Sequence, residues 1–137
     1  MNYSNFYARF YTFLQLSGAA FKRIFKFNFA KVYAGLIIFL QVLAWLQTIS
    51  IYRRLTGDFT ILHYNIDFGV DLIGRPQSIF YYPLLGLGVA LLNIVLTAIL
   101  ARRREARLII HFLMGAALAF AVFLSLALLA LNFINFR

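Results

Sequence analysis

The stretch IFYYPLLGLGVALLNIVLTAILA, residues 79–101, contains no Asp, Glu, Lys or Arg and decides the fold class. A helix needs about 20 apolar residues to cross a hydrocarbon layer of roughly 30 Å, and this stretch is long enough. Two more runs without these charged residues lie on either side of it, at residues 32–52 and 108–136. We therefore predict an all-α membrane protein in which these three runs are transmembrane helices.

The overall composition points the same way. The chain has 137 residues, of which 64% are hydrophobic and only 12% are charged. Roughly a quarter of the residues in an ordinary soluble domain are charged. We predict a single membrane domain over residues 1–137, because the three spans, one N-terminal segment and the loops account for the length. The chain contains no cysteine, which excludes disulfides and cysteine-based zinc sites.

The distribution of basic residues predicts an orientation. The formal net charge is +9, and nine of the 13 basic residues lie within residues 9–31 and 102–107. The positive-inside rule places both segments in the cytoplasm, and the 53–78 loop and the C-terminus outside. We expect a multi-pass protein of the cell membrane whose bases contact anionic lipid headgroups. We expect no nucleic acid partner, because no soluble module carries a basic stripe.

The N-terminal segment, residues 3–30, combines aromatic and basic residues. Apolar residues recur in it at near-helical spacing, which predicts an amphipathic helix in the cytoplasmic headgroup layer. An alternative is a tail that packs on a partner protein or on the spans. The apolar positions are Phe6, Phe10, Phe13, Leu14, Phe21, Ile24 and Phe25.

Small and polar residues share one face of each predicted span and predict helix packing. Gln41 and Asn93 fall near the middle of their spans, where an unpaired amide costs several kcal/mol, so each needs a hydrogen-bond partner. Thr97 and Ser125 lie on the same small-residue faces as the packing positions of spans two and three. We interpret these four residues as helix-packing groups, with the lining of a polar pathway as the alternative.

The loop at residues 53–78 contains the most distinctive pattern outside the spans. Apolar and polar residues alternate along its first half, which predicts a short extended segment or hairpin with one buried face. We take its polar residues as a candidate recognition surface: His63, Asn65, Asp67 and Asp71. A strand would separate His63 from Asp67 by about 13 Å, too far for one ion, so we assign no metal and no cofactor.

Part of this loop resembles a known family. His63-Tyr64-Asn65, followed by Asp71 and Gly74, is similar to the signature loop of SdpI-like bacterial membrane proteins, which carry a domain of unknown function. Phe68 stands where that family has its first Gly, and the Pro that usually precedes the motif is absent. The resemblance covers about fifteen residues. It implies a bacterial cytoplasmic-membrane protein in signalling or toxin immunity, and it supplies no catalytic residues.

These observations favour a non-enzymatic membrane protein that acts through helix and loop contacts, as a small subunit, a sensor or an immunity-type factor. The spans hold no paired carboxylates, no His cluster and no Ser/His/Asp set, which argues against an enzyme. The expected partners are the lipid bilayer and either another membrane protein or further copies of the chain. The alternative is an oligomeric transporter or channel component lined by Gln41, Asn93 and Thr97.

Overall fold

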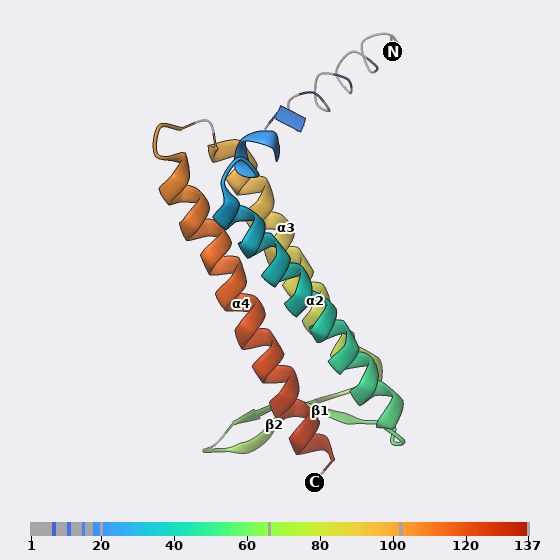
Figure 1. Cartoon of the computed structure of the whole chain (residues 1–137). Helices are drawn as coiled ribbons and strands as arrows, with labels where there is room; N and C mark the ends of the chain where they lie inside the picture. The colour runs from blue at the N-terminus through green and yellow to red at the C-terminus, as the bar shows by residue number, and fades with distance from the viewer. Residues whose placement is uncertain are drawn as a thin grey trace.

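The structure, a computed structural model, describes residues 7, 11, 15, 18, 19, 21–65, 67–101 and 103–136. Within these residues it contains three long helices and one β-hairpin (Figure 1). The helices are α2 (Asn28–Arg54), α3 (Tyr81–Leu100) and α4 (Ala106–Asn135). The strands are β1 (Thr60–Asn65) and β2 (Gly69–Gly74), and a short 3-10 helix, η1 (Pro76–Phe80), leads into α3. The predicted long apolar helices and the extended segment are therefore confirmed.

All three helices are long and apolar enough to cross a membrane. They measure 27, 25 and 30 residues when η1 is counted with α3. The most apolar 18-residue stretches of the three helices have mean hydropathies of 1.9, 2.3 and 2.5. Helix α2 begins four residues before the predicted span and ends two residues after it. The helix continues through Lys31, Arg53 and Arg54 because Lys and Arg are good helix formers. Their long side chains also carry the charge away from the apolar surface.

Small residues lie between the helices together with larger ones such as Ile110 and Leu128, and the outer surface is apolar as well. Ala30, Ala44, Ala117 and Ala121 are buried between the helices. Leu, Ile, Val and Phe side chains cover the outer surface. In the most apolar 18-residue stretch of each long helix, at most 33% is buried. Small residues let helix backbones approach closely, which is the packing expected where the surroundings are themselves apolar.

Both α2 and α4 come close to α3 at Gly86. A Cβ atom on Gly86 would lie 2.6 Å from Leu124 Cδ2 of α4 and 2.9 Å from Gln41 Oε1 of α2. The Gln41 amide Nε2 in turn donates a 2.6 Å hydrogen bond to the Pro83 carbonyl. A side chain at position 86 would therefore push on both neighbouring helices.

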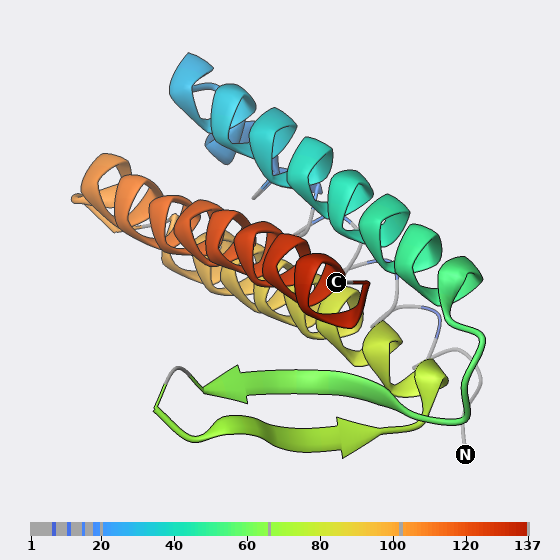
Figure 2. The ribbon, with the colours of Figure 1, turned by 90° about the horizontal axis from the view of Figure 1, so that it is seen from below.

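The hairpin lies across the end of the bundle where α2 and α4 end and α3 begins, which we call the hairpin end (Figures 1 and 2). The strands pair antiparallel, from Thr60 opposite Gly74 to Asn65 opposite Gly69, with irregular register around His63. In the turn, Asn65 Oδ1 accepts a 2.9 Å hydrogen bond from the Asp67 backbone N–H. Gly69 has a φ of 79°, which glycine adopts without strain.

We call the opposite end, where α2 and α4 begin and α3 ends, the basic end. Most of the predicted N-terminal amphipathic helix lies outside the described residues, including Phe6, Phe10, Phe13 and Leu14. In the described part, Ile24 is only 3% exposed and packs among the helices, while Phe21 stacks on Phe25. Residues 28–30 belong to α2. At Ile24 this piece packs on the spans, as the alternative interpretation expects, and its placement in the headgroup layer stays a prediction.

We predict that Gly86→Leu destabilises the bundle by about 1–3 kcal/mol, because the new side chain overpacks the contact with Gln41 and Leu124. Gly88→Leu is the matched control, since a Cβ at Gly88 meets nothing within 4 Å. Both variants gain the same helix propensity, so their difference isolates packing. Unfolding in mixed detergent micelles measures it. Equal stability of the two variants would contradict the close approach.

Candidate functional site

The hairpin is fixed to the end of α4 by one side chain, Asn135. Its Oδ1 accepts hydrogen bonds of 2.9 Å from the Ile61 backbone N–H and from the Thr60 hydroxyl. Its Nδ2 donates bonds of 2.9 Å to the Ile61 carbonyl and to the Leu131 carbonyl. The amide therefore satisfies both backbone groups of Ile61, as a neighbouring strand would.

A second attachment joins the hairpin to α3. The Tyr82 hydroxyl donates a hydrogen bond to the Leu62 carbonyl. The Leu62 side chain is buried against the helix ends, and it occupies the space that a side chain at Gly74 would need. A Cβ on Gly74 would lie 2.5 Å from Leu62 Cδ1. The base of the hairpin is thus held by α3 and α4 together.

The polar residues of the predicted recognition loop form their hydrogen bonds mostly within the hairpin. His63 Nδ1 and Asp71 Oδ1 lie 2.6 Å apart across the two strands, with side chains that are 60% and 42% exposed. An exposed pair of this kind contributes little to stability. Asn65 caps the turn through the Asp67 backbone.

Among the residues that the structure describes, no three His, Asp or Glu side chains are grouped as metal ligands would be. Asp71 is paired with His63, and Asp67 contributes its backbone N–H to the turn.

The apolar residues of the hairpin are mostly exposed. The alternation predicted one buried apolar face, and at the base Thr60 and Leu62 are indeed buried. Towards the tip the expectation fails: Tyr64 is 46% exposed and Phe68 is 84% exposed, while Ile66 lies outside the described residues. On β2, three more apolar side chains are exposed. We call the exposed set the apolar patch: Tyr64, Phe68, Val70, Leu72 and Ile73.

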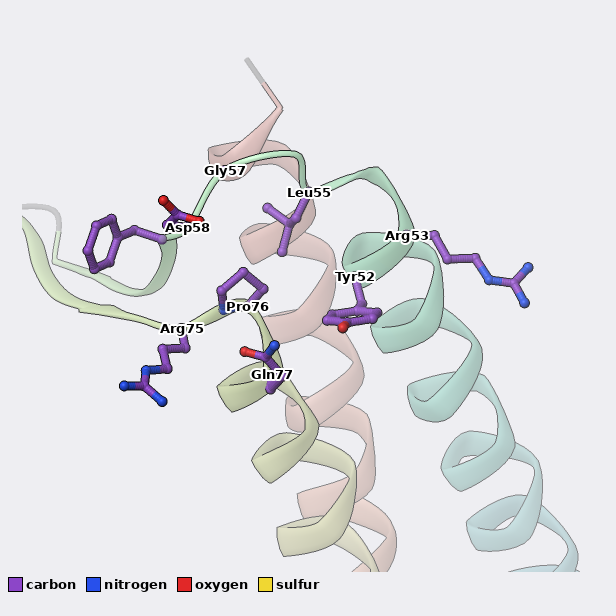
Figure 3. Close-up of a pocket in the computed structure, with 9 residues that line it drawn as sticks. Tyr52, Arg53, Leu55, Gly57, Asp58, Arg75, Pro76 and Gln77 are labelled. Atoms are coloured by element: carbon purple, nitrogen blue, oxygen red, sulfur yellow. The ribbon is translucent and has the colours of Figure 1, made fainter.

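A crevice of about 680 Å³ lies between the end of α2, the hairpin base and the start of η1 (Figure 3). Tyr52, Pro76 and Gln77 line it, and Arg53 and Arg75 stand at its margins with their guanidinium groups pointing away from each other. The two guanidinium charges therefore do not converge on the crevice, whose lining also includes Asp58.

The four polar residues of the predicted spans behave differently from one another. Gln41 bonds to a neighbouring helix through the Pro83 carbonyl. Asn93 bonds instead to the Val89 carbonyl of its own helix at 2.9 Å, and Thr97 bonds to the Asn93 carbonyl at 2.7 Å. Ser125 is buried, and its hydroxyl finds no partner among the described residues. These four side chains therefore do not meet at one hydrogen-bonding site.

Sequence reasoning missed the polar residues near the hairpin end. Asn135 holds the hairpin, and Arg54 reaches Asn132 Oδ1 at 3.3 Å while lying over the Phe136 ring at 3.9 Å. One signal in the sequence could have indicated them, because Asn132 and Asn135 lie three residues apart at the end of a long apolar run. That spacing places the two side chains next to each other on one face of a helix.

Aromatic contacts hold the basic end. The His111 ring stacks on Phe29 with centroids 3.9 Å apart, and its Nδ1 lies 3.3 Å from the Tyr33 hydroxyl. The basic side chains around it are exposed and have only one acidic neighbour, Glu105, in the described loop. The exposed basic residues are Lys22, Arg23, Lys26, Lys31, Arg103, Arg104 and Arg107.

Comparison of the chain with models of protein families, with curated proteins and with solved structures finds no match.

We predict that Asn135→Leu releases the hairpin from α4, because it removes the three bonds to Thr60 and Ile61. The two Ile61 backbone groups, which are part-buried, then lose their partners, at a cost of up to about 1–3 kcal/mol for each group. Amide hydrogen exchange at Ile61 should therefore become faster. Asn132→Leu, which loses only the bond to Arg54, is the control. Equal protection of Ile61 in both variants would show that Asn135 is not the attachment.

Proposed function

We propose that this chain is a three-span membrane protein without enzymatic activity, which acts by presenting its hairpin to a partner outside the cell. The observation that carries the proposal is the apolar patch, held on a base that is bonded to two helices. A hairpin of two strands is marginally stable alone in water. Fixing it to α3 and α4 while leaving its apolar side chains exposed favours a binding role over a linker.

Membrane insertion is supported by the apolar outer surface of the bundle. Large apolar side chains such as Phe39, Leu92 and Phe123 are more than half exposed on the long helices. In water this surface would be a severe aggregation hazard, whereas in a bilayer it meets acyl chains.

The orientation follows from the charges at the two ends. The basic end carries seven described Lys and Arg residues, and the hairpin end carries Arg53, Arg54 and Arg75 together with Asp58, Asp67 and Asp71. The positive-inside rule favours a cytoplasmic basic end, where the bases contact anionic headgroups. The hairpin and the C-terminus then face outward.

Within this framework the chain works as a small subunit, a sensor or an immunity-type factor. The short similarity to SdpI-like loops is compatible with the last two roles and stays a proposal. The partner's binding surface would be apolar, matching Phe68, Leu72 and Ile73. The transporter alternative gains no specific support, because Gln41, Asn93 and Thr97 are all engaged in hydrogen bonds within the bundle.

The orientation is tested with single cysteines, since the chain has none of its own. We expect an impermeant thiol reagent to label Phe68→Cys from outside intact cells, and to label Arg103→Cys only after permeabilisation. The opposite pattern would reverse the orientation. Recovery of the chain in the soluble fraction would refute membrane insertion.

Recognition is tested with a photo-crosslinking side chain at position 68 in intact cells. We expect one discrete protein adduct, absent when the probe is at Leu92, which is exposed on α3. If the apolar patch binds the partner, the double variant Tyr64→Ser and Leu72→Ser should abolish the adduct. If the His63–Asp71 pair binds it, the double variant His63→Ala and Asp71→Ala should abolish the adduct instead. No adduct, or an adduct that survives both double variants, would contradict recognition by the hairpin.

A further inference from the structure

The hairpin runs crosswise to the helices, at the level of the last turn of α4 and the first turn of α3 (Figures 1 and 2). Asn135 and Tyr82, which hold it, lie in those two turns. In Figure 1 the strands reach sideways past α4, and the C-terminal end of α4 extends beyond them. The outer half of the hairpin therefore lies to the side of the bundle.

The helices expose aromatic side chains at this same level. Tyr81 of α3 precedes Tyr82 by one residue, Phe133 of α4 precedes Asn135 by two, and both side chains are exposed. These rings lie within about 3 Å of the hairpin attachments along the helix axes. Exposed aromatic residues near the ends of membrane-spanning helices mark the interface between hydrocarbon and water. In a bilayer the hairpin is therefore held at the depth of this interface.

One face of the hairpin is turned towards the bundle. Thr60 and Leu62 are buried, and Leu62 belongs to a core cluster with residues of α2, η1 and α4. Tyr64 stands opposite Val70, as Thr60 stands opposite Gly74. The irregular register between these pairs does not change the face, because four residues separate them on both strands and side chains alternate. Tyr64 and Val70 therefore continue the face of Thr60 and Leu62, but both are exposed.

We propose that Tyr64 and Val70 rest in the interfacial layer of the bilayer, so that phospholipid covers the part of this face that the helices leave exposed. The face continues sideways from the helix ends, at the same depth, over the lipid that surrounds the bundle. Tyrosine suits this layer, because its ring contacts acyl chains while its hydroxyl bonds to headgroups and water. This inference rests on the membrane insertion proposed above.

Lipid on this face leaves the opposite face for the protein partner. Ile73 is adjacent to Gly74 on β2, which places its side chain on that opposite face, and it is exposed. The helices hold the hairpin along β1, through Ile61 and Leu62. The partner therefore reaches the hairpin from the side turned away from the membrane, or along the outer edge of β2.

Fluorescent labels on single cysteines test the lipid contact, since the chain has no cysteine of its own. The full chain is placed at low density in vesicles of phosphatidylcholine and phosphatidylglycerol. We expect the fluorophore NBD at Val70→Cys or Tyr64→Cys to show blue-shifted emission, quenching by phospholipids with a nitroxide near the headgroup, and loss of quenching by aqueous iodide. NBD at Ile73→Cys, the control on the opposite face, should be quenched by iodide. Equal iodide quenching at positions 70 and 73 would overturn the inference.

NBD at Leu92→Cys separates the two ways of failing. Leu92 is exposed on α3, so in an inserted chain this label is quenched by nitroxides placed deep in the acyl chains. If it is not, membrane insertion has failed and the function proposed above fails with it. If it is, while position 70 is open to iodide, only the present inference fails. Shielding of position 70 that disappears on dilution with lipid would assign this face to a second copy of the chain and also overturn the inference.

Discussion

The rest of the structure depends on the close approach of three helices at Gly86. The absence of a side chain there lets Gln41 of α2 and Leu124 of α4 come within contact of the α3 backbone. A carbonyl oxygen has two acceptor sites, so Pro83 can receive the Gln41 amide in addition to its own helical bond. One missing Cβ and one amide thus allow α2 and α4 to come close to α3 at this level, because close packing and hydrogen bonds are what hold helices together in apolar surroundings.

The position of the helices determines where the hairpin is held. Asn135 at the end of α4 and Tyr82 at the start of α3 must stand at a fixed separation to bond to consecutive residues, Ile61 and Leu62. The bundle therefore acts as a frame that keeps two strands ordered at one end. The contacts leave β2 free on its outer side, with Leu72 and Ile73 exposed.

The two ends of the bundle are chemically distinct. The basic end combines the stacked rings of Phe29 and His111 with exposed Lys and Arg side chains. At the hairpin end, acidic and basic residues are mixed and the apolar patch projects beyond the helices. Such a difference fits a molecule that is anchored by charge on one side and makes its contacts on the other.

The sequence by itself determined the three helices and the extended loop, because long uncharged runs and period-two alternation are local properties. It did not determine which of the alternating apolar residues are buried. Leu62 is buried and Phe68 is exposed, although both occupy apolar positions of the same alternation. It could not decide whether Asn93 bonds to its own helix or to another, since both carbonyls are suitable acceptors. The role of Asn135 depends on contact with a residue 74 positions away. Only the tertiary structure brings such groups together, because the packing of the helices, and not local sequence, sets their separation.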